Sequence, residues 1–338
     1  MYPRGAVNLE PPAGMSTSAT PTETLKCFVA EIFAKLGVPS EAARLTAAAL
    51  VAADVEGRPA HGVMLVPLYV ERMLAGSVSM QTEPTVVHDG GSAIVLDAEN
   101  ALGQLSSDWA IPMVSERARE HGLACIAVRN GAHFGTAAFW ARQIAEAGLV
   151  GIVMCNSPAV KRPPGGVEAL TGNNGLAIAL PSTDPHPFVT DLDVNEAAGD
   201  ATSMIAGLLL PQNRARGFGL AAAIDLLCGG LSGGALGPEV GQLSGSNGGD
   251  PSQPLGCSHL FIAIDPTRFG IAGLDARVAE FAGRIRDSRR APGVERIYAP
   301  GDRERARRAE NGEECLLDPE LLARLKECGK KIGVEREL

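Results

Sequence analysis

The stretch GAHFGTAAFWARQIAEAGLVGIVMCNSP, residues 131 to 158, contains the pattern on which the fold prediction for this chain rests. One histidine, His133, lies among small residues just before an amphipathic helix expected over residues 136 to 147. The apolar segment LVGIVMCN follows that helix and has the length and composition of a buried strand. Strands and helices that alternate in this way are typical of a sheet with helices packed on it, so the stretch predicts an α/β fold. It also raises a chemical question, because an imidazole in such a loop can project into a cleft.

The same alternation of short apolar strands and helices extends in both directions from this stretch. SAIVLDA (92–98) precedes a helix that Pro112 is expected to kink or to delay, and PFVTDLDV (187–194) follows the stretch as a further strand. The apolar segment SHLFIAIDP (258–266) predicts a buried strand late in the chain. The resulting division of the chain is a disordered tail over residues 1–21, a helical N-terminal part over 22–90, an α/β region over 91–235, and a C-terminal part over 236–338 that packs back on the N-terminal part.

Composition excludes several classes of protein. With 338 residues, 45% hydrophobic content and a formal charge of −9, the chain is a folded globular protein with a large core. Its densest basic stretch, RERARRAEN (303–311), mixes acids with the arginines at helical spacing, which indicates a solvated helix face and no nucleic-acid partner. The first twenty residues have no continuous apolar segment, so we expect neither a signal peptide nor a membrane span, and Met15 is an alternative start. Seven cysteines without C-x-x-C spacing predict a cytoplasmic protein with no disulfide framework and no metal site.

Nucleotide-binding motifs are absent in their usual form. Neither G-x-G-x-x-G after a strand nor G-x-x-x-x-G-K-[ST] occurs, which argues against an ordinary Rossmann domain. The segment KRPPGG, with Pro164, Gly165 and Gly166, could present backbone N–H groups to a phosphate, but it could equally form a simple Pro-Gly turn.

Two of the six histidines have a setting that suggests a function. His61 and His133 each lie in a loop of small residues directly before a helix, whereas His88, His121 and His186 are expected at the surface. A histidine satisfied within the core is the alternative interpretation for His61 and for His133. Sequence pattern alone leaves this choice open.

Seven segments follow one another along the chain: PAHGVMLVPLYVERMLAGSV, NGAHFGTAAFWARQIAEAGLVGIVMCNSP, RPPGG, PFVTDLD, LLLPQNRARGFGLAAAIDLLCGGLSGG, LFIAIDP and APGDRE. In this order they resemble the malate/L-lactate dehydrogenase family of NAD(P)-dependent oxidoreductases, which includes ureidoglycolate and sulfolactate dehydrogenases, diketogulonate reductase and piperideine-carboxylate reductases. The resemblance runs from about residue 22 to residue 325.

The resemblance implies a non-Rossmann α/β fold with a mixed sheet and helical terminal parts, assembled as a homodimer. It assigns NAD(P) binding and catalysis to residues 91–235, and dimerisation and substrate binding to residues 22–90. The implied reaction is reversible hydride transfer between NAD or NADP and a small molecule, a 2-hydroxy or 2-keto acid or a cyclic imine. A histidine can supply the proton that such a reduction needs at oxygen or nitrogen.

Site residues follow from the same resemblance, position by position. His133 and His61 correspond to the catalytic histidines, while Leu65 and Tyr69 fall at substrate-binding positions. The positions implied to bind the cofactor are Ser157, Pro164, Gly165, Gly166, Asp191, Arg216, Gly301 and Asp302.

Departures from the family pattern point to an altered substrate pocket. Ala60 replaces a serine beside His61, Leu65 replaces an arginine suited to a carboxylate, and Gly172-Asn173-Asn174-Gly175 replaces a Gly-Thr-Asn-Pro turn. The segment GDATSMIA (199–206) is shorter than its family counterpart, which helps to enclose the active site. Three interpretations stay open: a dehydrogenase acting on a changed 2-keto or 2-hydroxy acid or a related carbonyl, a cyclic-imine reductase, and a family-derived non-redox enzyme or binding protein that has lost hydride transfer.

Overall fold

A computed structural model of the protein describes residues 17–192, 214–243, 249–270, 272–311 and 313–338. Its centre is a seven-stranded mixed sheet with the order β2-β3-β4-β8-β5-β6-β7, in which β3 and β4 are parallel and every other neighbouring pair is antiparallel. A separate antiparallel ribbon joins β1 to β9. The strands are β1 (Ser18–Pro21), β2 (Thr85–Asp89), β3 (Ala93–Asp97), β4 (Leu123–Gly131), β5 (Val150–Cys155), β6 (Leu176–Leu180), β7 (Phe188–Leu192), β8 (Cys257–Ile264) and β9 (Glu314–Leu317).

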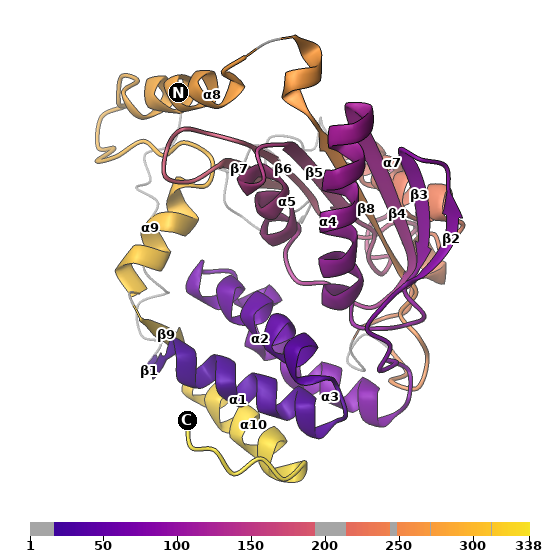
Figure 1. Ribbon diagram of the computed structural model, residues 1–338. Helices are drawn as coiled ribbons and strands as arrows, with labels where there is room; N and C mark the ends of the chain where they lie inside the picture. Colours follow the sequence, from indigo (N-terminus) through magenta and orange to yellow (C-terminus); the bar gives the residue numbers. More distant parts are fainter. Residues whose placement is uncertain (1–16, 193–213, 244–248, 271, 312) are drawn as a thin grey trace.

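Helices cover both faces of the large sheet, as Figure 1 shows, with α4 and α5 on one face and α7 and the π-helical turn η4 on the other. The helices are α1 (Thr22–Lys35), α2 (Ser40–Val55), α3 (Val66–Leu74), α4 (Gly103–His121), α5 (Ala137–Glu146), α7 (Arg214–Asp225), η4 (Leu226–Gly230), α8 (Leu274–Arg286), α9 (Asp302–Asn311) and α10 (Pro319–Lys331). Short 3-10 turns are η1 (Pro59–His61), η2 (Val63–Leu65), η5 (Gly237–Glu239) and η7 (Pro266–Phe269). Within the described ranges, no helix combines the length and the apolar character needed to cross a membrane.

The alternation of side chains along β4 explains why the sheet has two covered faces. Ile126 and Val128 pack with the residues of α4 and α5, while Ala127 between them packs with Ile224 and Cys228 on the opposite side. Successive side chains of a strand point to opposite faces, so an apolar residue at every position needs cover on both. The predicted α/β fold with a mixed sheet is confirmed.

The N-terminal helices form a second core together with the end of the chain. Helices α1, α2 and α3 gather with α10 and with the β1–β9 ribbon at one end of the molecule (Figure 1). Their apolar faces bury Phe28 and Leu50 in one cluster with Leu325 and Val334. The prediction of a disordered tail up to residue 21 is wrong for β1, because Ser18–Pro21 pairs residue by residue with β9; residues 1–16 lie outside the described part.

Two strands lie outside the parts predicted for them. β8, placed by sequence in the C-terminal part, is the central strand between β4 and β5, because its apolar side chains need burial on both faces. β2, placed in the helical N-terminal part, pairs with β3 at the sheet edge. Helix α4 begins at Gly103 and contains Pro112 within it, so the expectation of a late start is also wrong.

Candidate active site

Four of the sequence-predicted residues meet in one cavity of about 280 Å³. His133 comes from the loop between β4 and α5, His61 from η1, Ser157 from the segment after β5, and Asp191 from β7. These segments are far apart in the chain, and the sheet brings their ends together beside the N-terminal helices. Sequence reasoning assigned no site role to several further lining residues, among them Arg58, Asn174, Cys257 and His259.

The loop that carries His133 is fixed from both of its flanks. Thr136 caps α5 by accepting a hydrogen bond from Phe139 N at 3.4 Å, and the Trp140 indole donates to Phe134 O at 2.8 Å. Gly103 at the start of α4 has no side chain, and a Cβ there would lie only 2.4 Å from Ala132 O. Helix α4 can therefore approach the loop of His133 closely only because residue 103 is a glycine. This close approach holds the loop against the core.

Tyr69 and Leu65 are buried and are not among the residues that line this cavity. Tyr69 is 2% exposed, and its hydroxyl lies 2.6 Å from His133 Nδ1. Leu65 is 5% exposed and packs in the N-terminal core. The apolar face of η2 and α3 points into that core, and both residues predicted to bind substrate are on that face.

Three imidazoles share this cavity. His61 stacks on His133 with 5.7 Å between ring centroids, and His259 stacks on Phe134 at 4.3 Å. Burial, together with His61 and His259, lowers the pKa of His133 to about 3. Burial also lowers the pKa of His259 to about 3. Both rings are therefore neutral near pH 7, and a group that binds in this cavity meets neutral imidazole.

Ser157 is held by the turn of residues 172–175, which stood out in the sequence only because it differs from the family pattern. Its backbone N–H donates to Asn174 Oδ1 at 2.9 Å, and Asn174 N donates back to Ser157 Oγ at 3.2 Å. Asn174 has a φ of +47°, a left-handed conformation that asparagine tolerates better than most residues. Its side-chain amide donates to Ala221 O at 2.8 Å and to Asp225 Oδ2 at 3.0 Å. This buried network ties the serine to α7 on the far side of the sheet.

A second cavity of about 530 Å³ adjoins the first and shares Arg58 and Asp191 with it. These two residues form an ion pair at 2.6 Å, and Arg58 also pairs with Glu304 at 3.0 Å. Three more arginines line the second cavity, and after burial they are the main cause of the lowered pKa of His186 at its wall. They are Arg142, Arg305 and Arg308.

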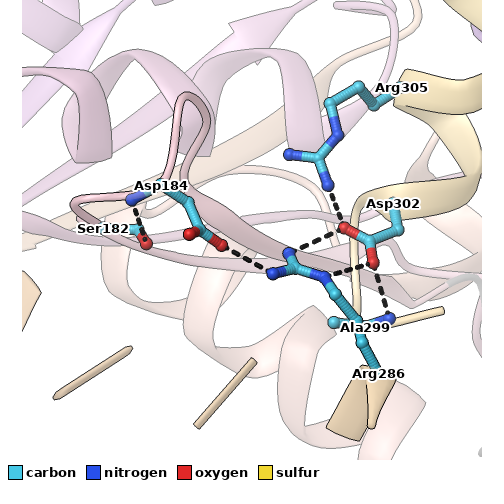
Figure 2. A network of polar contacts seen from close by, with 6 residues as sticks. All are labelled: Ser182, Asp184, Arg286, Ala299, Asp302 and Arg305. Atoms are coloured by element: carbon cyan, nitrogen blue, oxygen red, sulfur yellow. Dashed lines mark hydrogen bonds and ion pairs between the residues drawn. The ribbon is translucent and has the colours of Figure 1, made fainter. Parts of the chain in front are cut away.

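Gly301 and Asp302, predicted together as a cofactor contact, have different positions. Gly301 lines the second cavity, and its φ of +88° is one that favours glycine. Asp302 is 3% exposed and accepts two hydrogen bonds from Arg286, at 2.8 and 3.0 Å, and another from Arg305 (Figure 2). Burial by itself would raise the pKa of Asp302, but these bonds outweigh it and lower that pKa. The structure therefore places Asp302, predicted to contact the cofactor, in a buried ion-pair network next to the second cavity, and not in its lining.

Four other predicted cofactor residues line neither cavity. Pro164, Gly165 and Gly166 form an exposed turn closed by a hydrogen bond from Gly166 N to Pro163 O, and Arg216 is exposed in the first turn of α7. The Pro-Gly turn, the simpler alternative for KRPPGG, describes this segment. The shortened segment 199–206 lies outside the described residues.

Comparison with known proteins agrees with this architecture. The family model described as malate/L-lactate dehydrogenase matches residues 20–198 and 193–326. A malate dehydrogenase of Pyrococcus abyssi is 30% identical over 319 residues, which cover 84% of this chain and 86% of the relative. The structure of malate dehydrogenase from Pyrococcus horikoshii matches with a TM-score of 0.85 and 27% identity, covering 100% of both chains. A Δ1-piperideine-2-carboxylate reductase from Pseudomonas syringae pvar. tomato matches with a TM-score of 0.75 and 26% identity, covering 92% of this chain and 100% of the other.

The fold and the paired histidines thus define an α/β protein of the dehydrogenase class that lacks the usual dinucleotide-binding motif. The chain belongs to the malate/L-lactate dehydrogenase family.

Proposed function

We propose that this protein transfers hydride reversibly between NAD or NADP and the carbonyl or imine carbon of a small molecule. The observation that carries the proposal is the joint position of His133 and His61 in a cavity that shares Arg58 and Asp191 with a second, larger cavity. The first has room for a small substrate and the ring of a cofactor, and the second has room for the rest of a dinucleotide.

The groups around the second cavity fit a dinucleotide. Arg142, Arg305 and Arg308 offer guanidinium donors of the kind that bind phosphate, and Gly301 leaves the wall free of a side chain. We propose that these residues hold the phosphates and ribose, and that Ser157 and Asp191 lie near the nicotinamide end. A bound nicotinamide would supply or accept the hydride. The relatives named above, two malate dehydrogenases and an imine reductase, support this assignment.

His133 is the proposed partner of the reacting oxygen or nitrogen. Charge develops on that atom as the carbon is reduced, and a hydrogen-bond donor already aimed at it stabilises the transition state more than the ground state. The fixed loop and the buried setting of His133 supply such a preorganised donor. His61, stacked on the same ring, is the second proposed catalytic histidine.

The substrate pocket favours a carbonyl or imine compound that does not depend on a strongly held carboxylate. Arg58 carries the only guanidinium or ammonium group among the described residues of the first cavity, and it is already paired with Asp191 and Glu304. A small 2-keto acid would have to compete for it, so pyruvate is expected to be a poor substrate.

Titration of the purified protein with NADH and NADPH, followed by nicotinamide fluorescence, tests the proposal directly. Saturable binding of either cofactor, with oxidation of the bound nucleotide by a member of a panel of 2-keto acids, ketones and cyclic imines, is the expected result. Binding without turnover of any panel member would favour a family-derived binding protein, and the absence of binding would overturn the proposal.

We propose that the protein is a homodimer that works in the cytoplasm, as the sequence resemblance implies. Exposed apolar side chains on η4 and directly after it, among them Leu226 and Leu231, offer a surface that a second subunit could cover. Light scattering at micromolar protein is expected to give twice the chain mass, and a monomer mass would exclude the dimer.

A further inference from the structure

The ring of His133 receives two hydrogen-bond donors at the same nitrogen. The hydroxyl of Tyr69 lies 2.6 Å from Nδ1, and the backbone N–H of Gly135 points at the same atom from 3.2 Å. A backbone N–H can only donate, so Nδ1 has to accept, and an accepting ring nitrogen carries a lone pair and no proton. In the neutral ring the proton then resides on Nε2.

The hydrogen bonds around Tyr69 indicate that its hydroxyl donates its proton to His133 Nδ1. Gln104 Nε2 donates to the Tyr69 hydroxyl at 3.3 Å, which uses a lone pair of that oxygen and leaves its proton for another acceptor. Two acceptors are within reach, His133 Nδ1 at 2.6 Å and His133 O at 3.4 Å, and the shorter contact is with the ring. Tyr69 is 2% exposed and Gln104 is fully buried, so solvent does not compete for these bonds.

We infer that Tyr69 is a positioning residue which, with the N–H of Gly135, holds His133 as the Nε2–H tautomer and so makes it a hydrogen-bond donor to the substrate. Tyr69 and Gly135 both occupy Nδ1, so Nε2 is the ring nitrogen left to meet a ligand in the cavity that His133 lines. The arrangement also opposes the doubly protonated ring, since a proton on Nδ1 would face the N–H of Gly135. Its catalytic consequence rests on the proposed function, but the tautomer itself does not.

This assignment changes how the histidine works in the proposed reaction. A neutral Nε2–H donates a hydrogen bond to the carbonyl oxygen or imine nitrogen, and the bond strengthens as negative charge develops there. The ring keeps its proton, and the proton that completes the alcohol or amine comes from water. Three contributions keep the ring in this form: burial, the nearby imidazoles of His61 and His259, and the two donors at Nδ1. Tyr69 thus acts through His133 and makes no contact with the substrate.

Nitrogen NMR of the wild-type protein, labelled with ¹⁵N at histidine, reports the tautomer without any need for turnover. The two ring nitrogens of a neutral imidazole differ strongly in chemical shift according to which one carries the proton. The signals of His133 are assigned by their loss in His133→Asn. We expect a protonated Nε2 and an unprotonated Nδ1 at neutral pH; a protonated Nδ1 in the wild type overturns the inference, whether or not the protein proves to be a dehydrogenase.

Tyr69→Phe removes the hydroxyl donor and keeps the ring, and Tyr298→Phe, in the loop before α9, is the matched control. A hydrogen bond of ordinary net strength shifts an equilibrium by roughly threefold to tenfold, so the Nε2–H to Nδ1–H ratio of His133 should fall by about that factor in Tyr69→Phe. The kcat/KM should fall with it, while Tyr298→Phe leaves both unchanged. An unchanged tautomer ratio in folded Tyr69→Phe would assign the tautomer to Gly135 alone and overturn the role of Tyr69. Should Tyr69→Phe fail to fold, Gln104→Leu, which removes the donor that orients the Tyr69 hydroxyl, is expected to lower the same ratio, and an unchanged ratio there counts equally against the inference.

Discussion

His133 and His61 lie in one cavity, but their surroundings predict unequal importance. His133 is buried and is fixed by two donors at Nδ1 and by the capped loop that carries it, whereas His61 is only half-buried in a 3-10 turn. His133→Ala is therefore expected to lower kcat/KM by about 10²- to 10⁴-fold, and His61→Ala by less. Steady-state reduction of the best substrate in the panel measures both. Full activity in His133→Ala beside an inactive His61→Ala would reverse the assignment.

The close packing around Gly62, next to His61, predicts that a larger residue there lowers the stability of the protein. A Cβ at this position would lie 2.2 Å from Asp54 Oδ2, the atom that accepts a hydrogen bond from Val63 N at 2.7 Å. The carboxylate cannot move aside without losing that bond, so Gly62→Ala should destabilise the protein by about 1 to 3 kcal/mol. Urea unfolding measures the effect. Gly283→Ala in α8, where no atom lies within 4 Å of the added carbon, is the control and should be neutral or slightly stabilising.

Sequence reasoning found the two histidines that are proposed to act in catalysis, but it did not find the contacts that hold them. His61 and His133 stand out because small residues surround them in loops before helices. Tyr69 and His133 are 64 positions apart, and His259 reaches the cavity from a strand whose apolar sequence predicts only burial. No local pattern records such contacts, since they depend on which strands become neighbours.

At the scale of elements, one arginine of α8 links three segments around the second cavity. Arg286 donates two hydrogen bonds to Asp302 at the start of α9 and one, at 2.8 Å, to Asp184 in the β6–β7 connection (Figure 2). This link holds the loop of Gly301 against β7, where a Cβ would lie 3.4 Å from Val189 N. Arg286 therefore contributes to the position of the cavity wall, because it joins both segments that meet there.

Arg286→Met is expected to destabilise the protein by about 3 kcal/mol, because the carboxylate of Asp302 stays buried after losing its main partner. The affinity for NAD(P)H should fall as well, since the Gly301 loop is released. Arg284→Met is the matched control on the same helix: Arg284 is 73% exposed and pairs only with Glu280 among the described contacts. Its effect should stay within about 0.5 kcal/mol. Equal losses in the two variants, by urea unfolding and fluorescence titration, would contradict the role of the link.

The elements themselves were predictable to different degrees. Periodic helices such as α5 and α10, and apolar strands such as β4 and β5, carry their own signal in the sequence. The edge strand β2 is exposed along its whole length and has no apolar alternation, so nothing local marks it. β1 is four residues in a polar segment and exists because β9 pairs with it from nearly 300 residues away.

At the scale of the whole molecule, the site lies where the N-terminal helices meet the sheet. Ion pairs cross this junction: Arg142 of α5 binds Glu56 after α2 at 2.7 and 3.1 Å, and Arg58 binds Asp191 of β7 at 2.6 Å. Composition and periodicity could predict an α/β class. They could not predict that β8 enters the centre of the sheet, which is the step that brings His259 to His133.

Buried titratable groups at this junction predict how stability depends on pH. The native pKa values of His133 and His259 are about 3, against 6.5 for a free imidazole. Below pH ~6.5 these histidines are therefore protonated in the unfolded chain but not in the native state. Each of them lowers the free energy of unfolding by about 1.4 kcal/mol for every unit by which the pH falls. Asp54 acts in the opposite sense, because burial raises its pKa from 3.8 to about 7, so the native state binds the extra proton in that window.

Between pH ~4 and ~6.5 the two histidines and the one aspartic acid change the free energy of unfolding in opposite directions. Their summed contribution should make it rise with pH by about 1.4 kcal/mol per unit. His259→Phe keeps a ring stacked on Phe134 and removes one of the two histidine contributions, so the remaining slope from these groups should approach zero. Urea unfolding at a series of pH values measures both slopes, with His88→Asn, at an exposed position on β2, as the control. A slope that His259→Phe leaves unchanged would show that His259 binds its proton equally in the folded and unfolded states, which is incompatible with a neutral, buried ring beside the candidate catalytic histidine.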